Sequence, residues 1–149
     1  HVTSSMHGEN GYSCNTPENA ARRVAQLHTK LARGRKDIVM TRYFGPEDCA
    51  TLIVTSGVVT RAARSAARAA NAAGDKVGVL QLQTLWPFAD AEVREAAHKA
   101  GRVVVAEMNY AGQLAGEVKK CVPDPSLVVG VNTYNGGIMT PSQIAAALL

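Results

Sequence analysis

The sequence predicts an α/β protein in which helices cover both faces of a parallel β-sheet. Predicted strands and helices alternate from residue 51 to the end of the chain, the order typical of parallel strands joined by crossover helices. The strands are continuous runs of Val, Leu and Ile, as in strands buried on both faces. Aromatic residues make up only 5% of the chain and alanine is abundant, which favours Ala-rich helices lying on a Val/Leu sheet.

Length and composition exclude several classes of protein. The 149 residues suggest one domain with a sizeable core, and no apolar run approaches the roughly 20 residues of a membrane span. The net charge of +4 is mild; it is compatible with acidic partners but does not indicate nucleic-acid binding. The chain begins at His1, has no secretory signal, and is expected to be a processed or excised piece of a longer polypeptide.

The three cysteines are Cys14, Cys49 and Cys121, and they lie far apart without any C-x-x-C pair. This spacing predicts neither an iron–sulfur cluster nor a structural zinc site within the chain. A sparse, odd set of cysteines is typical of a reducing cytosol, so a cytoplasmic location is expected.

Residues 1–36 are predicted to be a linker and a helix leading into a domain at 37–149. The polar segment 1–15 contains His1, His7 and Glu9, but their spacing matches no known metal-ligand pattern, and a solvated loop is favoured. Thr16-Pro17 provides an N-cap and a first-turn proline, and Gly34 is expected to end the helix. Its apolar stripe is Ala20, Val24, Leu27 and Leu31. Its basic residues are interpreted as a solvated face, with docking of an acidic partner as the alternative.

The next segment predicts a short edge strand at Ile38–Tyr43 and a buried strand at Thr51–Thr55. The turn Ser56-Gly57 leads into a helix over Val58–Ala73, which Gly74 ends. This strand–turn–helix contains neither G-x-G-x-x-G nor a P-loop, although its helix N-terminus could hold an anion. One outer face of the helix carries Arg61, Arg64 and Arg68, interpreted as solvent-facing rather than as a phosphate site.

Val77–Phe88 is the segment around which the domain is expected to be organised. It begins as a buried strand and ends abruptly at Pro87, which lacks an N–H and biases Trp86 towards extended geometry. Thr84, Trp86 and Phe88 therefore follow the carboxyl end of a strand, where open α/β sheets bind ligands or partners. Packing of Trp86 and Phe88 in the core or in an interface is favoured over direct chemistry.

The remaining chain continues the alternation. Asp90 is expected to cap a helix that stops at Gly101, and Val103–Ala106 is a buried strand. A helix opens at Gly112-Gln113-Leu114, and Leu127–Val131 is the last strand. Thr140-Pro141-Ser142-Gln143 is a capping box for a final helix that buries Ile144 and Leu148.

Right-handed crossovers should bring Ser56, Thr84 and Glu107 to one edge of the sheet. They form no nucleophile–base–orienter set, because no histidine lies at a strand end. Glu107, with Asn109 beside it, could orient a ligand. The favoured interpretation is that both side chains accept backbone N–H groups and fix the turn to Gly112-Gln113. The residues alone therefore predict no complete active site.

Several segments resemble the last domain of the α-type subunit of 2-oxoacid:ferredoxin oxidoreductases. They occur in the family's order across nearly the whole chain, and the pair T-L-W-P-F and E-M-N-x-x-G-Q-L is the most specific. The segments are Gly8–Leu31, Tyr43–Asp48, Val54–Gly57, Thr84–Phe88, Val105–Asn109, Gly112–Leu114 and Thr140-Pro141. Ala89 stands where the family commonly has a proline, which changes only the entry to a helix.

The resemblance implies a transketolase C-terminal-like fold, a three-layer α/β/α sandwich. Its five-stranded sheet is mostly parallel with one antiparallel edge strand, which the residues alone do not indicate. The resemblance also implies a parent enzyme that decarboxylates a 2-oxoacid oxidatively, forms acyl-CoA and reduces ferredoxin. Thiamine diphosphate, Mg, iron–sulfur clusters and coenzyme A are expected on other domains or subunits, with none bound by this chain alone.

The expected partners are the other domains and subunits of an oligomeric parent enzyme, and ferredoxin through that complex. No catalytic residue is carried over, and the isolated chain is expected to be inactive. Strand-end or interface candidates are Ser56, Gly57, Thr84, Trp86, Pro87, Phe88, Glu107, Asn109 and Gln113. Two alternatives stay open: a domain of another thiamine enzyme, of the E1 β type or transketolase type, and a stand-alone anion- or nucleotide-binding module.

Overall fold

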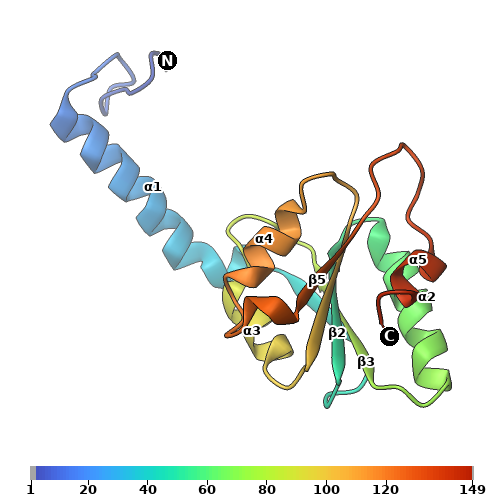
Figure 1. Cartoon of the computed structure of the whole chain (residues 1–149). Coiled ribbons are helices and arrows are strands. Elements are labelled where there is room, and N and C mark those ends of the chain that lie inside the picture. Colours follow the sequence, from blue (N-terminus) through green and yellow to red (C-terminus); the bar gives the residue numbers. More distant parts are fainter. Residues whose placement is uncertain (1–2, 149) are drawn as a thin grey trace. The chain divides into compact units, whose positions relative to one another are not determined.

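The computed structural model describes residues 3–148 and divides the chain into two compact units (Figure 1). The first is His1–Ile38 and the second is Val39–Leu149. No helix in the described part is both long and apolar enough to cross a membrane.

The first unit consists of a loop and helix α1 (Pro17–Ile38). The Thr16 hydroxyl accepts the N–H of Asn19 at 3.3 Å, which confirms the predicted N-cap. The expected helix end at Gly34 is wrong, because α1 continues for four more residues. A glycine costs only about 1 kcal/mol in a helix interior, and Arg35 and Lys36 suit the negative end of the helix dipole.

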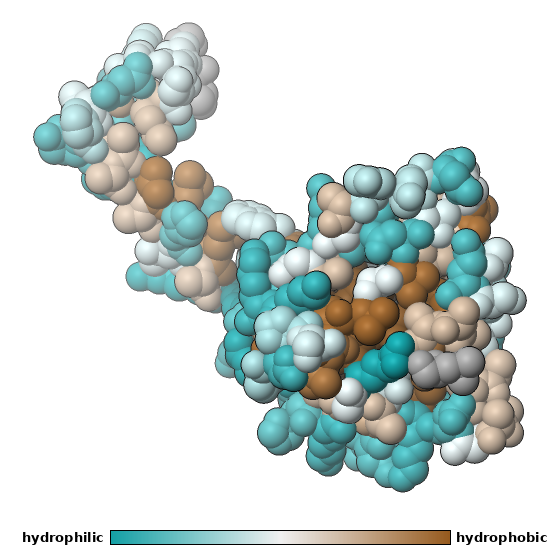
Figure 2. Space-filling model, in the orientation of Figure 1, coloured by the Kyte–Doolittle hydropathy of each residue, from teal (hydrophilic) through white to brown (hydrophobic). Residues whose placement is uncertain are grey.

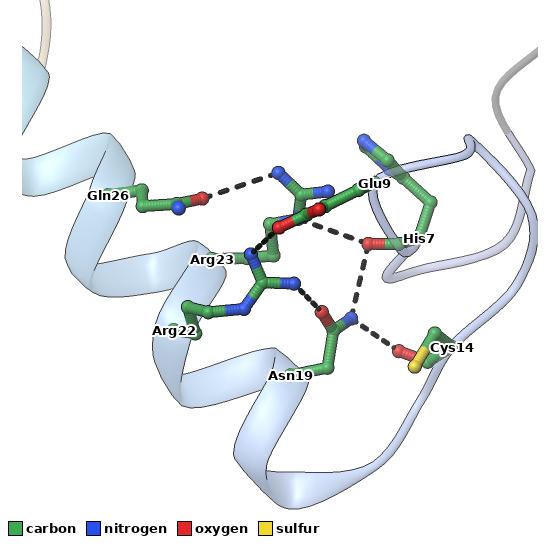
Figure 3. A network of polar contacts seen from close by, with 7 residues as sticks. All are labelled: His7, Glu9, Cys14, Asn19, Arg22, Arg23 and Gln26. Carbon is green, nitrogen blue, oxygen red and sulfur yellow. Dashed lines mark hydrogen bonds and ion pairs between the residues drawn. The ribbon is translucent and has the colours of Figure 1, made fainter.

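The loop before α1 is held to the first turns of the helix by a polar network (Figure 3). Buried Asn19 donates through its side-chain amide to the carbonyls of His7, at 3.1 Å, and Cys14, at 2.7 Å. Arg22 binds the Asn19 side-chain oxygen at 2.8 Å and the Glu9 carboxylate at 3.0 Å. Glu9 is thus engaged by an arginine, His1 lies outside the described residues, and the loop is fixed to the helix.

The second unit contains a five-stranded sheet in the order β1-β3-β2-β4-β5. The strands are β1 (Thr41–Phe44), β2 (Thr51–Ser56), β3 (Val77–Leu82), β4 (Arg102–Glu107) and β5 (Val128–Asn132). β1 runs antiparallel to β3, and the other neighbours are parallel. The antiparallel edge strand that the resemblance implied is confirmed, and the all-parallel sheet predicted from the residues alone is wrong.

The edge strand β1 begins at Thr41, three residues later than predicted. It is short and only partly buried, and none of its residues is fully enclosed. Its apolar pattern therefore carries little information on position or direction. Pairing with β3, from Thr41 opposite Leu82 to Phe44 opposite Val79, fixes both.

Helices cover both faces of the sheet and make the predicted three layers (Figure 1). One face carries α2 (Val59–Ala72) and α5 (Pro141–Ala145), and the other carries α3 (Asp90–Ala97) and α4 (Gln113–Lys119). A single 3₁₀ turn, Pro125–Leu127, precedes β5.

Three helix boundaries differ from the prediction. Asp90 is the first residue of α3 and Ala89 its N-cap, and α3 ends at Ala97 rather than near Gly101. α5 ends at Ala145, so Ile144 is buried within it whereas Leu148 lies beyond it and is only partly buried. Short helices on a sheet end where their buried face ends, and that point depends on packing rather than on the next glycine.

Successive residues of the central strands point to opposite layers. In β2, Leu52 and Val54 join the cluster under α3 and α4, and Ile53 joins the cluster under α2 and α5. All three are completely buried. Because both faces of the sheet are covered, the strand sequence is continuously apolar.

The β5 edge of the sheet presents apolar side chains to the surface. Val129 and Val131 of this strand are partly exposed, and β5 pairs only with β4 among the described residues. In Figure 2, hydrophobic residues gather in the middle of the visible face of the second unit and hydrophilic residues surround them. An open, apolar sheet edge is typical of a surface that another segment covers.

Candidate functional site

The carboxyl ends of β2 and β4 form one wall of a pocket of about 390 Å³. Ser56 ends β2 and Glu107 ends β4, and parallel pairing places both at the same edge of the sheet. Six of the nine candidate residues line this pocket: Ser56, Gly57, Phe88, Glu107, Asn109 and Gln113. Trp86, Pro87 and Thr84 do not.

Glu107 is buried at the start of α4, and its carboxylate is fully engaged by the protein. One oxygen accepts the N–H of Leu114 at 2.8 Å and the other that of Ala115 at 3.0 Å. The side-chain amide of Asn109 also donates to Glu107. The carboxylate thus satisfies N–H groups that the first turn of a helix leaves without an intrahelical partner.

Asn109 completes the turn between β4 and α4. Its side-chain oxygen accepts the N–H of Gly112 at 2.8 Å and that of Gln113 at 3.3 Å. Its carbonyl accepts the side-chain amide of Asn132, at 2.9 Å, which ties the turn to the end of β5. Gly112 has φ +67°, a left-handed conformation that disfavours other residues. Glu107 and Asn109 therefore bind backbone, the arrangement favoured from the sequence, and they do not present free groups to a ligand.

Thr84 follows β3 at the same edge of the sheet as the pocket but does not line the pocket. Its hydroxyl accepts the N–H of Met40 at 3.2 Å and so fixes the segment that enters β1. The prediction that Ser56, Thr84 and Glu107 share one edge of the sheet is confirmed, but Thr84 does not line the pocket with the other two.

Trp86 does not pack in the core of the chain. Its side chain is 69% exposed, the neighbouring Leu85 is 53% exposed, and the Trp86–Pro87 peptide bond is cis. Phe88, by contrast, is partly buried against the core cluster under α3 and α4. Of the two predicted alternatives, core or interface packing, the structure confirms core packing for Phe88, whereas Trp86 does not pack in the core of the described residues and its packing in an interface stays a prediction.

Exposed apolar side chains follow each of the four parallel strands. Tyr110 follows β4 and Tyr134 follows β5, and their rings meet edge to face with centroids 4.9 Å apart. Both rings are more than 60% exposed. We name this set the strand-end collar: Val58, Leu85, Trp86, Met108, Tyr110 and Tyr134.

The sequence analysis missed the two tyrosines of the collar. The signal was available, because Tyr110 and Tyr134 each follow a predicted buried strand within four residues. Three of the seven aromatic residues of the chain thus lie exposed at one edge of the sheet. Exposed aromatic side chains gathered in this way are typical of interfaces.

A larger hollow of about 820 Å³ lies away from the strand ends, between β1 and α3. Tyr43 lines it and donates from its hydroxyl to the Pro46 carbonyl at 2.5 Å. The pKa of the Tyr43 phenol is raised, mainly by burial and to a smaller extent by a hydrogen bond with the Cys49 thiol. The Tyr43 phenol is thus held in its neutral form and engaged by backbone, so it is not suited to act as a general base.

The described residues offer no ligand set for a metal or cluster. Across residues 3–148, no three His, Cys, Asp or Glu side chains converge. Cys49 and Cys121 are buried, and the Cys121 thiol donates to the Glu117 carbonyl at 3.5 Å. Burial raises the pKa of the Cys121 thiol.

Comparison with known proteins gives a match to one protein family. The family model described as pyruvate:ferredoxin oxidoreductase core domain II matches residues 50–144. These residues cover the sheet from β2 onwards, the pocket and the whole strand-end collar.

Similar proteins of known name come from archaea. The chain is 32% identical to 2-oxoglutarate synthase subunit KorA of Methanothermobacter thermautotrophicus over 99% of its length, and 34% identical to that of Archaeoglobus fulgidus over 97%. It is 33% identical, over 62% of its length, to ketoisovalerate oxidoreductase subunit VorB of M. thermautotrophicus. The chain spans 39% of the length of each KorA protein and 26% of VorB.

Solved structures share the fold. The 2-oxoglutarate:ferredoxin oxidoreductase of Magnetococcus marinus superposes with a TM-score of 0.86 at 23% identity, over 99% of this chain and 26% of that one. A split-gene transketolase, described as an inactive β4 tetramer, superposes with a TM-score of 0.59 at 25% identity, over 73% of this chain and 40% of that one.

Proposed function

Because this chain belongs to the family of pyruvate:ferredoxin oxidoreductase core domain II, we propose that it is the C-terminal domain of the α-type subunit of a 2-oxoacid:ferredoxin oxidoreductase. Such an enzyme decarboxylates a 2-oxoacid oxidatively to an acyl-CoA and reduces ferredoxin. The similarity to KorA subunits over nearly the whole chain supports the assignment to an α-type subunit, and leaves the choice of 2-oxoacid open.

In this proposal the chain supports the assembly and does not react by itself. Thiamine diphosphate, magnesium, iron–sulfur clusters and coenzyme A are held by other domains or subunits of the cytoplasmic enzyme. The commitment of Glu107 and Asn109 to backbone N–H groups supports this division, because both side chains already serve the turn into α4. The separate, largely buried cysteines support it as well.

The strand-end collar is the proposed contact with those other domains or subunits. The observation that carries this assignment is the exposure of Trp86, 69%, at the end of the central strand β3. Large aromatic side chains are enriched at the centres of protein interfaces, where they supply much of the binding energy. The nine candidates take two roles here: Glu107, Asn109, Gln113 and Thr84 shape the strand-end turns, while Ser56, Gly57, Trp86, Pro87 and Phe88 form or support the contact surface.

An activity assay with reconstitution tests the proposal. The 149-residue chain is mixed with thiamine diphosphate, Mg²⁺, coenzyme A and a viologen dye, and dye reduction is followed with 2-oxoglutarate, pyruvate or 2-oxoisovalerate. We expect no turnover from this chain alone, and turnover once it is co-expressed with the remaining domains and subunits of its enzyme. Turnover by the isolated chain would refute the supporting role.

The split-gene transketolase gives a second candidate, a domain of a different thiamine enzyme. Co-purification from the native host separates the two assignments. A complex that contains iron–sulfur subunits supports the ferredoxin oxidoreductase, whereas a complex with transketolase or E1-type subunits and no iron contradicts it.

A further inference from the structure

A groove of about 590 Å³ lies between α2 and the segment that leads into α5. One wall carries the guanidinium groups of Arg61, Arg64 and Arg68. The other contacts are mostly apolar and include Val58, Ile138 and Pro141. The sequence analysis correctly expected an exposed arginine row, but only the fold shows that the row borders a groove.

The three arginines have no acidic partner within residues 3–148. No ion pair or hydrogen bond of their side chains is present in that part of the chain, and α2 contains no Asp or Glu. Arg61 and Arg68 are seven residues apart, about 10 Å along the helix axis. Three uncompensated positive charges therefore form one line of that length along the groove.

Arg64 is held in place by an aromatic ring. Its guanidinium carbon lies 4.0 Å from the centroid of the Phe44 ring, and that of Arg42 lies 5.0 Å from the same centroid. Stacking uses the face of a guanidinium group and leaves its N–H donors, which lie in its plane, available for an anion. Arg64 is thus partly ordered before any ligand arrives, which lowers the entropic cost of binding.

The chemistry of the groove selects a class of ligand. Planar guanidinium groups bind phosphate oxygens through paired hydrogen bonds, and a line of three charges fits more than one phosphate group. Ile138 is 72% exposed and Val58 is 56% exposed, so the groove also offers an apolar surface that a flat ring can cover. The volume falls within the range of small-molecule sites.

We propose that this groove binds a nucleoside polyphosphate. The phosphates lie along Arg61, Arg64 and Arg68, and the base covers the apolar surface of Val58, Ile138 and Pro141. The groove shares Val58 with the strand-end collar, and its other residues lie outside the collar. The site does not depend on the proposed function, because every residue it uses lies in this chain.

Calorimetric titration of the 149-residue chain tests the site with ADP, pyrophosphate and adenosine as probes. We expect saturable binding of ADP, weaker binding of pyrophosphate and the weakest binding of adenosine. The triple substitution Arg61→Gln, Arg64→Gln, Arg68→Gln should weaken ADP binding by at least about ten-fold, because charge-assisted hydrogen bonds to phosphate are lost. Ile138→Ser should reduce the advantage of ADP over pyrophosphate.

A charge-matched control is available on α1. Lys30→Gln, Arg33→Gln, Lys36→Gln removes the same net charge from a different surface and should leave ADP binding unchanged. Circular dichroism and thermal midpoints establish that both triple variants are folded.

Four outcomes would overturn the proposal. The first is that ADP shows no saturable binding, and the second is that the α1 control variant loses as much ADP affinity as the arginine variant. The third is that ADP and pyrophosphate bind with equal affinity and Ile138→Ser has no effect. The fourth is that the chain binds polyglutamate and not ADP. The last outcome would assign the arginine row to an acidic protein partner instead.

Discussion

Glu107 shows how one residue can look catalytic in the sequence and act structurally in the fold. A carboxylate at the end of a parallel strand is a common position for catalysis, and here it is buried. Both of its oxygens accept backbone N–H groups of α4, so its negative charge is balanced by the helix start rather than by a ligand.

Substitution of Glu107 tests this role. Glu107→Ala leaves the N–H groups of Leu114 and Ala115 buried without acceptors, and should lower the free energy of unfolding by about 2–4 kcal/mol. Glu117→Ala on the same helix removes a surface ion pair with Lys120 and should cost less than about 0.5 kcal/mol. Urea unfolding measures both variants. A Glu107→Ala variant as stable as the wild type would contradict the capping role.

Trp86 tests the proposed contact at the scale of one side chain. Trp86→Ala should change the free energy of unfolding of this chain by less than about 1 kcal/mol, because the ring is mostly exposed. Phe88→Ala, its matched control, should cost about 2–4 kcal/mol through lost core packing. Only Trp86→Ala should leave the chain stable yet impair its assembly with the rest of the enzyme in a pull-down. Normal assembly of that variant would exclude Trp86 from the interface.

At the scale of elements, the packing of β1 against β3 depends on a glycine. A Cβ placed on Gly78 would lie 2.2 Å from the Tyr43 hydroxyl and 3.1 Å from the Cys49 sulfur. Tyr43 crosses the neighbouring strand at this point and is held by the Pro46 carbonyl. The edge strand β1 can therefore pack against β3 in this way only because Gly78 has no side chain.

Two glycine substitutions test this requirement. Gly78→Ala should lower the free energy of unfolding by about 1–3 kcal/mol, because the Tyr43 ring must move. Gly116→Ala, at an exposed position of α4, meets nothing within 4 Å and should raise the free energy of unfolding by about 0.5–1 kcal/mol through helix propensity. Chemical denaturation distinguishes the opposite signs, and a neutral Gly78→Ala would show that β1 is not constrained by this contact.

At the scale of the whole molecule, the hydrophobic core belongs to the second unit. Among residues 3–148, all buried hydrophobic residues lie between Cys49 and Ile144, in two clusters on either side of the sheet. In α1 the buried residue is polar, Asn19, and it serves the loop network of Figure 3. Burial of apolar surface dominates stability, so the second unit is expected to be the source of cooperative folding.

Deletion of residues 1–38 tests this expectation. The fragment 39–149 should unfold in one transition, with a free energy of unfolding within about 1 kcal/mol of the full chain. Differential scanning calorimetry and urea titration provide the comparison. Loss of the cooperative transition in the fragment would show that α1 contributes to the core.

The sequence by itself determined the features that depend on a few neighbouring residues. The Thr16 cap and the Thr140–Gln143 capping box are confirmed, since the side chain and the backbone group it binds are at most three residues apart. The buried strands were also predictable, because covering both faces of a sheet requires continuous apolar runs. The interpretation of Glu107 and Asn109 is also confirmed, because each binds N–H groups of the helix start that follows it within eight residues.

Only the tertiary structure decided the features that join distant segments. Four such features depend on segments at least 20 residues apart. They are the direction of β1, the exposure of Trp86, the contact between the Tyr110 and Tyr134 rings, and the groove beside Arg64. Such contacts form when the core folds, and neither propensity nor periodicity of a single segment encodes them. An apolar side chain that follows a strand looks the same in the sequence whether it enters the core, like Phe88, or remains outside it, like Trp86.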